Sequence, residues 1–426
     1  MPSVGWQAFA HSLFEWLCLD FVLESGDGWV TQALGSGLIR RIGNEARDYA
    51  WGSTTLIPDY FGVPATGKPM AEIWFGTHAG SPTRVLNQDH SDAGTLLDLR
   101  QGQPLDFLLK LLAAGQPLSL QAHPNSAQAA EGFARENALG LALDAANRNY
   151  KDDKHKPEML VALTPFQALG GFRPIEQIEQ LFGWLAGSEV PQLATAFSGW
   201  LSVLRAEGLR ALFVQLLQVG SAVAPVTQAL AEHAEELLAE HPGSDYEQHL
   251  GLVLQLQQHY PGDPGVVASL LLNFIELQPG EAVQIAAGQI HAYVSGLGVE
   301  IMAASDNVLR GGLTPKHIDT AELQRVLDFA AEQVPVLTAR ELAAGLWQYP
   351  RQCDDFLLYR LELDGTRVLA DLKLANPAIV LCTAGQVAVS DSTEAREVLT
   401  KGEAAYLADA RFSTFAGSGT VFLATN

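Results

Sequence analysis

Two polar side chains that could bind one metal ion stand close together in the segment QAHPN, which follows a long apolar run. Gln121 and His123 are separated by one residue, and alternate residues of a strand point to the same face of a sheet. An amide oxygen and an imidazole nitrogen can both act as ligands. The pair is therefore a candidate for half of a ligand set. The alternative is a histidine that makes an ordinary hydrogen bond in a loop.

A second polar pair lies in HKPE, and a further histidine lies in GQIH. Lys156 and Glu158 are expected on one face of a strand, where burial of both charges is unfavourable unless they form an ion pair or bind a ligand. With Gln121 and His123, the carboxylate of Glu158 and the imidazole of His291 would complete a mixed set of oxygen and nitrogen donors. Such a set suits zinc. A simple ion pair between Lys156 and Glu158 is the alternative.

A third polar segment, Gly298–Asp319, contains Glu300 and two cations. Glu300 is expected on a short strand. Arg310 is followed by two glycines, whose missing side chains let a ligand approach the backbone. Arg310 and Lys316 are the kind of cations that an acidic protein places against a phosphate or a developing oxyanion. Arg-Gly-Gly also occurs in ordinary loops, so the spacing alone leaves both interpretations open.

The elements that must position these residues follow from the apolar pattern. Residues 38–84 are expected to form short strands and tight loops, and Asp106–Ala114 fits either a buried strand or a helical turn. From residue 175 to about residue 260 the period becomes helical. The clearest apolar stripes are Ile175, Ile178, Leu181, Phe182 and Leu185, and Leu209, Leu212, Phe213, Leu216 and Leu217. Beyond the turn YPGDPG, short apolar segments with glycine turns indicate strands and, from about residue 348, a sandwich or jelly roll.

The composition excludes several classes of partner. The chain has 426 residues and a formal net charge of -22, which repels nucleic acid and anionic membranes, so neither is expected as a partner. The three cysteines are scattered, which fits a reducing compartment, and we expect the cytoplasm. Residues 1–36 are expected to be an extension without chemistry of its own. Their apolar run is too short to cross a bilayer, so neither a signal peptide nor an anchor is expected. A monomer is expected.

Several segments together resemble the type I mannose-6-phosphate isomerases, and they follow the order of that family. The segments are DYAWGS (48–53), AEIWFGTH (71–78), PLSLQAHPN (117–125), NYKDDKHKPEM (149–159), GQIHAY (288–293) and SDNVLRGGLTPKHID (305–319). The combination of QAHPN, HKPE and SDNVLRGGLTPK is specific. The resemblance covers residues 38–319, and the C-terminal part matches in position more than in motif.

The resemblance implies a mainly β fold with a helical insertion: a cupin-like jelly-roll core, an inserted helical domain and a second jelly roll at the C-terminus. This order agrees with the apolar pattern. The expected domains are an N-terminal extension (1–36), the first part of a catalytic cupin-like domain (37–174), a helical insertion domain (175–265), the second part of the catalytic domain (266–345) and a C-terminal jelly-roll lobe (346–426).

The resemblance also implies roles for residues of this sequence. The residues that match the family's ligands for one zinc ion are Gln121, His123, Glu158 and His291. Arg310 matches its active-site arginine. Ser119 and Lys316 match residues that hold the phosphate end of the sugar.

The implied reaction is the interconversion of D-mannose 6-phosphate and D-fructose 6-phosphate by metal-assisted proton transfer between C1 and C2 through a cis-enediol. Lys156 or Glu300 could be the base, and the sequence slightly favours Lys156. The alternative is a non-catalytic, metal-containing cupin that binds sugar phosphates. Such a protein could keep the metal ligands while losing Arg310 and Lys156, and both are present.

Overall fold

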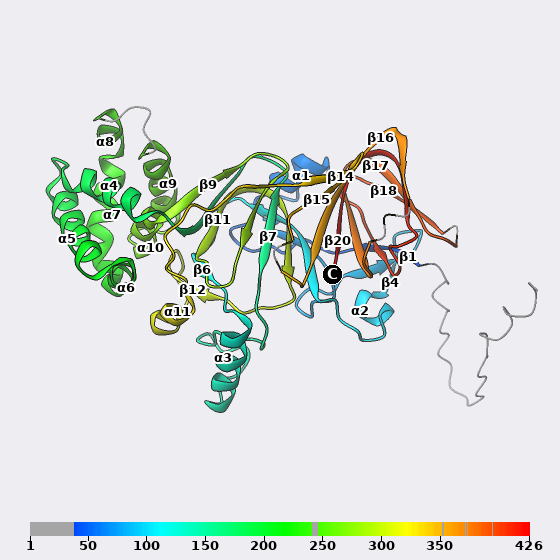
Figure 1. The fold of residues 1–426 in the computed structure, drawn as a ribbon, viewed down its shortest axis with the longest axis horizontal. Coiled ribbons are helices and arrows are strands. Elements are labelled where there is room, and N and C mark those ends of the chain that lie inside the picture. The colour runs from blue at the N-terminus through cyan, green and yellow to red at the C-terminus, as the bar shows by residue number, and fades with distance from the viewer. Residues whose placement is uncertain (1–37, 241–245, 352, 371, 373, 394) are drawn as a thin grey trace, which may run out of the picture. The chain divides into compact units, whose positions relative to one another are not determined.

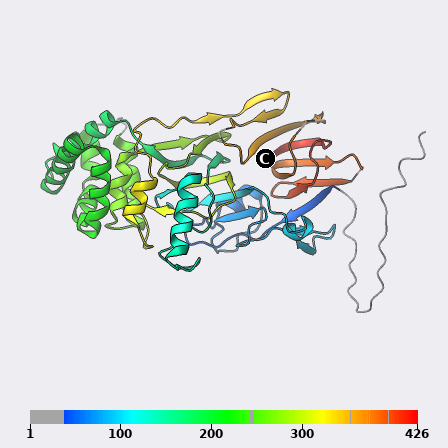
Figure 2. The same ribbon diagram turned by 60° about the horizontal axis from the view of Figure 1, so that its bottom comes forward.

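The computed structural model describes residues 38–240, 246–351, 353–370, 372, 374–393 and 395–426. Residues 37–426 form one compact unit, and the predicted extension of residues 1–36 lies outside the described residues. Within this unit, two views show helices α4 to α10 at the end that lies opposite strands β16 to β18 (Figures 1 and 2). The predicted mainly β fold with a helical insertion is confirmed.

The described strands belong to two antiparallel sheets. The site sheet contains β12 (Leu309–Arg310), β6 (Gln121–Ala122), β11 (His291–Ala303), β7 (Glu158–Ala162), β10 (Glu281–Ile285), β13 (Leu337–Thr338), β5 (Phe107–Ala114), β2 (Glu72–Phe75), β8 (Phe166–Phe172) and β9 (Leu272–Leu277). The C-terminal sheet contains β14 (Arg340–Ala343), β15 (Leu346–Gln348), β16 (Leu357–Leu369), β20 (Thr414–Thr425), β17 (Ala378–Ser390), β19 (Ala404–Leu407), β18 (Arg396–Thr400), β1 (Ile39–Gly43), β3 (Arg84–Leu86) and β4 (Asp92–Thr95).

The described helices lie mostly between β8 and β9. They are α4 (Ile175–Ala186), α5 (Pro191–Glu207), α6 (Leu209–Val219), η1 (Gly220–Val223), α7 (Ala224–Glu232), α8 (Ala234–Glu240), α9 (Tyr246–His259), α10 (Pro264–Ala268) and η2 (Ser269–Leu271). The other helices are α1 (Leu56–Phe61), α2 (Leu96–Leu99), α3 (Ser126–Ala138) and α11 (Thr320–Val326).

Side chains of the central strands of the site sheet alternate between its two faces, so that one face packs in a core and the other carries the site. Phe107, Leu109 and Leu111 of β5 pack in a cluster that also contains Ile379 and Phe422 of the C-terminal sheet. The residues between them point to the opposite face, because successive side chains of a strand alternate. The core between the two sheets thus fixes the register of the strands whose other face carries the polar residues. The ambiguous segment Asp106–Ala114 proves to be a strand, β5, with all of its residues buried.

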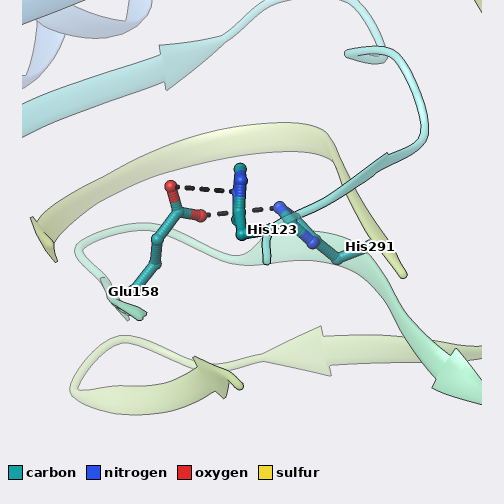
Figure 3. Close-up of side chains that lie close together, drawn as sticks. All are labelled: His123, Glu158 and His291. Atoms are coloured by element: carbon teal, nitrogen blue, oxygen red, sulfur yellow. Dashed lines mark ion pairs between the residues drawn. The ribbon is translucent and has the colours of Figure 1, made fainter. Parts of the chain in front are cut away.

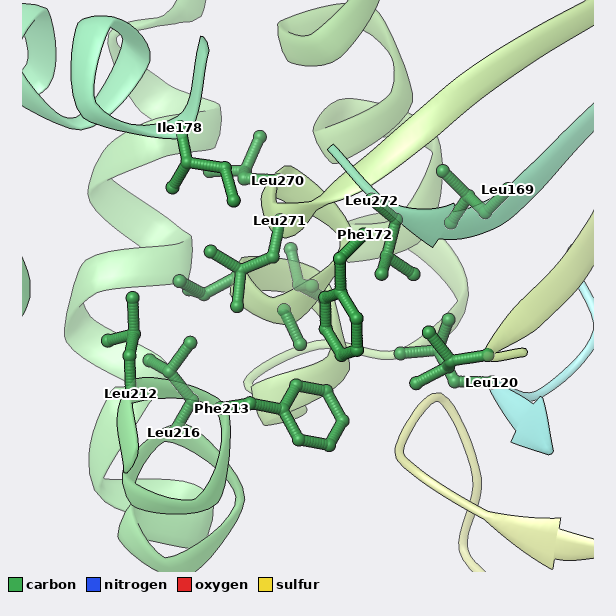
Figure 4. Close-up of a cluster of buried hydrophobic side chains, with 14 of the residues drawn as sticks. Leu120, Leu169, Phe172, Ile178, Leu212, Phe213, Leu216, Leu270, Leu271 and Leu272 are labelled. Carbon is green, nitrogen blue, oxygen red and sulfur yellow. The ribbon is translucent and has the colours of Figure 1, made fainter. Parts of the chain in front are cut away.

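The predicted helical stripes pack against strand β8 and its surroundings. All five residues of the predicted stripe in α6 are buried, and so are four of the five in α4. Phe172 of β8 packs with Phe213 of α6, their ring centroids 5.4 Å apart, in a cluster of leucines from helices and strands (Figure 4). By length and composition, the stretch Leu209–Glu232 could also cross a membrane. Its apolar residues, such as Leu216 and Leu230, instead form part of this core.

The first described strand belongs to the C-terminal sheet. β1 pairs with β19, and Ile39 lies opposite Leu407. Strand β3 then pairs with β1, so part of the segment predicted as the start of the catalytic domain extends the C-terminal sheet. The local apolar pattern did not indicate this pairing, because it joins residues that are more than 300 positions apart.

Candidate metal and sugar-phosphate site

Strand pairing places three of the predicted site residues side by side. Gln121 of β6 lies opposite His291 of β11 and opposite Arg310 of β12. Residues directly opposite each other in antiparallel strands point to the same face of the sheet. The amide, the imidazole and the guanidinium therefore face one space. His123 follows β6, which ends at Ala122, so the expectation that Gln121 and His123 share a strand is wrong.

Glu158 stands between the two predicted histidine ligands. Its Oε1 is 3.4 Å from His123 Nε2, and its Oε2 is 3.5 Å from His291 Nε2. Figure 3 shows the three side chains converging on one point. One ligand atom from each residue lies within 4.8 Å of the other two, and all three residues are buried. Among the described residues, this is the cluster of histidine and carboxylate groups that could hold a metal ion.

The hydrogen bonds of the histidines prepare them for a metal ion. His123 Nδ1 is 2.7 Å from the carbonyl oxygen of Asn307, and His291 Nδ1 is 3.1 Å from that of Gln289. A carbonyl only accepts, so each Nδ1 carries the proton and each Nε2 offers a lone pair towards Glu158. His123 Nε2 is completely buried and has no hydrogen-bond partner. A buried nitrogen without a partner is costly, and a bound metal ion would satisfy it.

Gln121 can add a fourth donor to this set. Its Nε2 donates a hydrogen bond to Ser119 Oγ at 3.3 Å, which leaves the amide oxygen available as a ligand. One amide oxygen, one carboxylate and two imidazoles match the donor types that zinc accepts. The residues present thus fit a zinc ion.

Burial and charge keep the ligands in the protonation states that metal binding needs. Burial lowers the pKa of His123 to about 4, an effect that the nearby Lys156 reinforces. Burial alone would raise the pKa of Glu158, but the charge of Lys156 holds it well below its usual range. Both ligands are therefore deprotonated at neutral pH.

Lys156 lies just before β7, which begins at Glu158, so these two residues do not share a strand as predicted. Their side chains nevertheless meet, because Lys156 Nζ is 3.0 Å from Glu158 Oε1. The ion pair between Lys156 and Glu158, which the sequence offered as the alternative to ligand binding, is present. It forms part of the same cluster as the histidines. Lys156 thus faces the cluster next to its carboxylate.

A second buried charge cluster lies on the same face of the sheet, and the sequence analysis missed most of it. Lys110 Nζ is 3.2 Å from Glu72 Oε1 and 2.9 Å from Glu300 Oε2. Trp74 Nε1 donates to Glu72 Oε2 at 3.0 Å. Lys110 lies opposite both Trp74 and Glu300 across the sheet, which explains why they meet. The available signal was a single lysine in the middle of the apolar run FLLKLLAA.

This cluster contains more carboxylates than cations. Burial opposes the charge of Lys110, but Glu300 and Glu72 raise its pKa above the usual range, so it stays protonated. Burial raises the pKa of Glu300, the charge of Lys110 opposes this rise, and the negative charges of Glu158 and Glu72 add to it. Glu300 was expected on a short strand, but it lies on the long strand β11 that begins with His291.

Two adjoining cavities connect the clusters. The inner cavity has a volume of about 560 Å³ and is lined by Glu158, His291, Lys110 and Glu300, among others. The outer cavity has a volume of about 1000 Å³ and includes Ser119, Lys316 and residues of the helical insertion. Both cavities are lined by Gln121 and Arg310. A ligand can therefore present one end to the inner cluster and the other end to the outer cations.

The outer cavity carries positive charge in an acidic chain. Burial lowers the pKa of Arg310 from its ordinary value, although a guanidinium remains protonated. Burial and the charge of Arg310 lower the pKa of Lys316. Two cations that repel each other favour an anion between them. The predicted pair Arg310 and Lys316 thus lies where it could bind a phosphate.

The inner cavity has one more acid that the sequence analysis did not single out. Asp306 lines it, and its Oδ2 is 2.9 Å from His78 Nε2. Burial would raise the pKa of Asp306, but the hydrogen bond from His78 and its charge lower it. His78 also packs edge-on against Trp74, with ring centroids 4.9 Å apart.

Comparisons with known proteins agree with this site. A family model described as the catalytic domain of phosphomannose isomerase type I matches residues 39–175. The mannose-6-phosphate isomerase of Salmonella typhimurium is 37% identical over 387 residues, which cover 87% of this chain and 94% of the relative. The human mannose-6-phosphate isomerase is 34% identical over 387 residues, which cover 82% of this chain and 88% of the relative.

Solved structures give the same result. A crystal structure of the Salmonella typhimurium mannose 6-phosphate isomerase, described as bound to substrate and to a zinc atom, superposes with a TM-score of 0.78 at 34% identity. It covers 91% of this chain and 99% of its own. Fold, site geometry and similarity over most of the chain lead to one conclusion. The chain belongs to the phosphomannose isomerase type I family.

Proposed function

We propose that the chain interconverts D-mannose 6-phosphate and D-fructose 6-phosphate by moving a proton between C1 and C2 through a cis-enediol. The observation that carries the proposal is the pair of adjoining cavities. A set of metal-ligand and acid–base side chains lines the inner cavity, and Ser119, Lys316 and Arg310 line the outer one. Membership of an isomerase family supports the catalytic interpretation over a non-catalytic sugar-phosphate-binding cupin.

The proposed zinc ligands are Gln121, His123, Glu158 and His291. A bound zinc ion would act as a Lewis acid on the sugar oxygens at the reacting carbons. The protein's own part is to hold the ligands in place. The carbonyls of Asn307 and Gln289 fix both imidazoles, and Lys156 pairs with the carboxylate of Glu158.

The phosphate group would be held in the outer cavity. Lys316 and Arg310 would supply charge, and Ser119 a hydroxyl donor. Arg310 also lines the inner cavity, so it is placed to stabilise negative charge that develops on the sugar oxygens. Holding the phosphate would orient C1 and C2 towards the acid–base groups and lower the entropic part of the barrier.

The surroundings of Glu300 favour it as the general base. Its raised pKa makes the carboxylate a stronger base than an exposed glutamate, and it lines the inner cavity. Glu300 keeps this raised pKa although it pairs with Lys110. Lys156, which the sequence slightly favoured, is in an ion pair with the proposed ligand Glu158 and would have to lose its proton to act as a base. A lysine in that position is suited to orienting a hydroxyl or balancing charge. We therefore propose Glu300 as the base and Lys156 as a group that binds the sugar.

The reaction itself can be tested by incubating zinc-loaded protein with mannose 6-phosphate in D₂O and following the conversion of the sugar by NMR. We expect fructose 6-phosphate that contains deuterium at C1, because a base that removes a proton exchanges it with solvent. Absence of turnover by the folded, zinc-loaded protein would contradict the proposed function. Turnover that leaves the product free of deuterium would contradict proton transfer through an exchanging base.

Two variants separate the candidate bases. Glu300→Gln should lower kcat by roughly 10²- to 10⁴-fold and remove the pH dependence that its ionisation causes. Lys156→Met should raise KM while the pH profile keeps its shape. Near-normal kcat in Glu300→Gln, together with loss of kcat in Lys156→Met, would reverse the two assignments.

A further inference from the structure

A carboxylate at the end of the helical insertion contacts the loop of residues 311–316. Asp263 lies in the turn between α9 and α10. Its Oδ1 accepts hydrogen bonds from the N–H of Leu313 at 2.9 Å and from that of Gly265 at 2.7 Å. Its Oδ2 accepts from the N–H of Thr314 at 3.2 Å. One side chain therefore joins the turn of the insertion to this loop.

The loop needs such support because its backbone is strained. Gly312 has a φ of 128° and Leu313 a φ of 54°. The second value lies in the left-handed region, which is unfavourable for leucine. Strained residues persist only where their surroundings hold them in place. The side chain of Leu313 is buried in the core, and Asp263 holds the backbone N–H of Leu313 and of the next residue with charge-assisted bonds.

The contact between the turn and the loop is close. A Cβ on Gly265 would lie 2.7 Å from the nitrogen of Leu313, and a Cβ on Gly312 would lie 2.8 Å from the Cα of Gly265. On its other side, the loop is bonded to the segment that leads into the site. The N–H of Leu120 donates to the oxygen of Gly312 at 3.0 Å, and the N–H of Gly311 donates to the oxygen of Leu120 at 2.8 Å.

The two ends of this loop carry the cations of the outer cavity. Arg310 precedes the loop and Lys316 ends it, and the N–H of Lys316 donates to Thr314 Oγ1 at 3.1 Å. Asp263 lines the same cavity, but both of its oxygens already accept hydrogen bonds from backbone N–H groups. A carboxylate in contact with a phosphate would repel it. Asp263 thus acts on the loop and not on the ligand.

We propose that Asp263 is a positioning residue that sets the affinity of the outer cavity for phosphate, by holding the loop between Arg310 and Lys316 in its strained conformation. The inference rests on the proposed function, because it takes the phosphate end of the substrate to lie in this cavity. It gives the turn that ends the helical insertion an indirect part in substrate recognition, through this loop.

The test compares four zinc-loaded proteins: wild type, Asp263→Ala, Asp263→Asn and Asp391→Ala. Asp391 directly follows β17 of the C-terminal sheet and is a matched control, since its side chain also accepts from several backbone N–H groups, including those of Leu38 and Thr393. Binding of inorganic phosphate is measured by a ³¹P NMR titration. Zinc content, KM and kcat for mannose 6-phosphate are measured on the same samples.

We expect Asp263→Ala to weaken phosphate binding and to raise KM by about tenfold, which is the scale of losing charge-assisted hydrogen bonds. The change in kcat should be smaller, and zinc content should stay that of the wild type. Asp263→Asn keeps one oxygen acceptor and should give an intermediate loss. Asp391→Ala loses comparable backbone bonds and should bind phosphate like the wild type.

Wild-type phosphate affinity in a folded Asp263→Ala protein would overturn the proposal. An equal loss of phosphate affinity in Asp391→Ala would also overturn it, because the effect would then be a general loss of stability. If Asp263→Ala does not fold, Asp263→Asn decides, and unchanged phosphate binding there counts against the proposal. Wild-type protein that binds phosphate without turning over mannose 6-phosphate would refute the proposed function, while the binding series still tests Asp263.

Discussion

At the scale of single residues, the site depends on a carboxylate that is held ionised in a buried place. Glu158 is only 3% exposed, yet its pKa lies well below the usual range because the charge of Lys156 is close to it. A buried charge is stable only with partners that compensate for lost hydration. The same partners orient Glu158 between the two Nε2 atoms, so stability and metal binding depend on one set of contacts.

Replacing Glu158 by glutamine tests the contribution of its charge to zinc binding while the shape of the side chain is kept. Glu158→Gln keeps the volume but leaves Lys156 without its partner and gives the metal a neutral ligand. We expect zinc affinity to fall by at least about tenfold. The metal content after dialysis against a weak chelator measures this. Glu276→Gln, on the exposed side of β9, is the matched control and should retain zinc. Full zinc retention in Glu158→Gln would contradict the assignment of this ligand.

The proposed metal ligands were accessible from sequence because their motifs are local. QAHPN, HKPE and GQIH each contain donor residues at short spacing. Glu72, Lys110 and Asp306 were not found, since they reach the site through strand pairings and loops far apart in sequence. Lys110, for example, meets Glu300 only because β5 and β11 pair in one particular register. No local pattern specifies that register.

At the scale of elements, helical periodicity was the more reliable signal. The stripes in α4 and α6 follow the predicted residues, because each helix buries one face against a common core. The strands were harder to assign. β5 is buried on both faces, so it lacks the alternation that distinguishes a strand from a helical turn. Likewise, β1 joins the C-terminal sheet through a pairing that only the folded chain reveals.

His249 of α9 should make the stability of the folded protein depend on pH. It is buried, and burial together with the charge of Arg173 lowers its pKa from 6.5 to about 3. Below pH 6.5 the unfolded chain binds a proton at this histidine that the folded chain excludes. This contribution is therefore intact above pH 6.5 and is lost as the pH falls towards 3, by about 1.4 kcal/mol per pH unit.

Urea unfolding of zinc-free protein at pH 7 and pH 5 measures this effect. We expect the free energy of unfolding of the wild type to fall by about 2 kcal/mol more than that of His249→Gln, which has no proton to bind. His233→Gln, at a half-buried histidine between α7 and α8, is the control and should behave like the wild type. Equal losses of stability in the wild type and in His249→Gln would contradict the neutral, buried state of this histidine.

At the scale of the whole unit of residues 37–426, the two sheets share one core. Residues of β5 and β11 pack with residues of β17 and β20 in a single apolar cluster. The face of the site sheet that points away from this cluster carries the charges of the site. The predicted domain boundaries remain a proposal, but this shared core indicates that the C-terminal lobe supports the site sheet directly.

Phe422→Ala tests that support. Phe422 is 2% exposed in the shared core, and its truncation should cost about 3–5 kcal/mol of unfolding free energy. Phe412 is 53% exposed, and Phe412→Ala should be close to neutral. Thermal unfolding followed by circular dichroism, together with zinc release, gives the measurement. If Phe422→Ala lowers the unfolding temperature of the C-terminal sheet while zinc release stays unchanged, the two sheets fold independently and the shared core does not couple them.

The most direct test of the central claim is the turnover of mannose 6-phosphate to fructose 6-phosphate after removal of metal by a chelator and again after addition of zinc. The double variant Gln121→Ala, His123→Ala is measured in parallel. We expect activity to disappear with the metal, to return with zinc in the wild type and to stay absent in the folded double variant. Full activity in the metal-free wild type, or no activity after zinc is restored, would contradict a zinc-dependent isomerase.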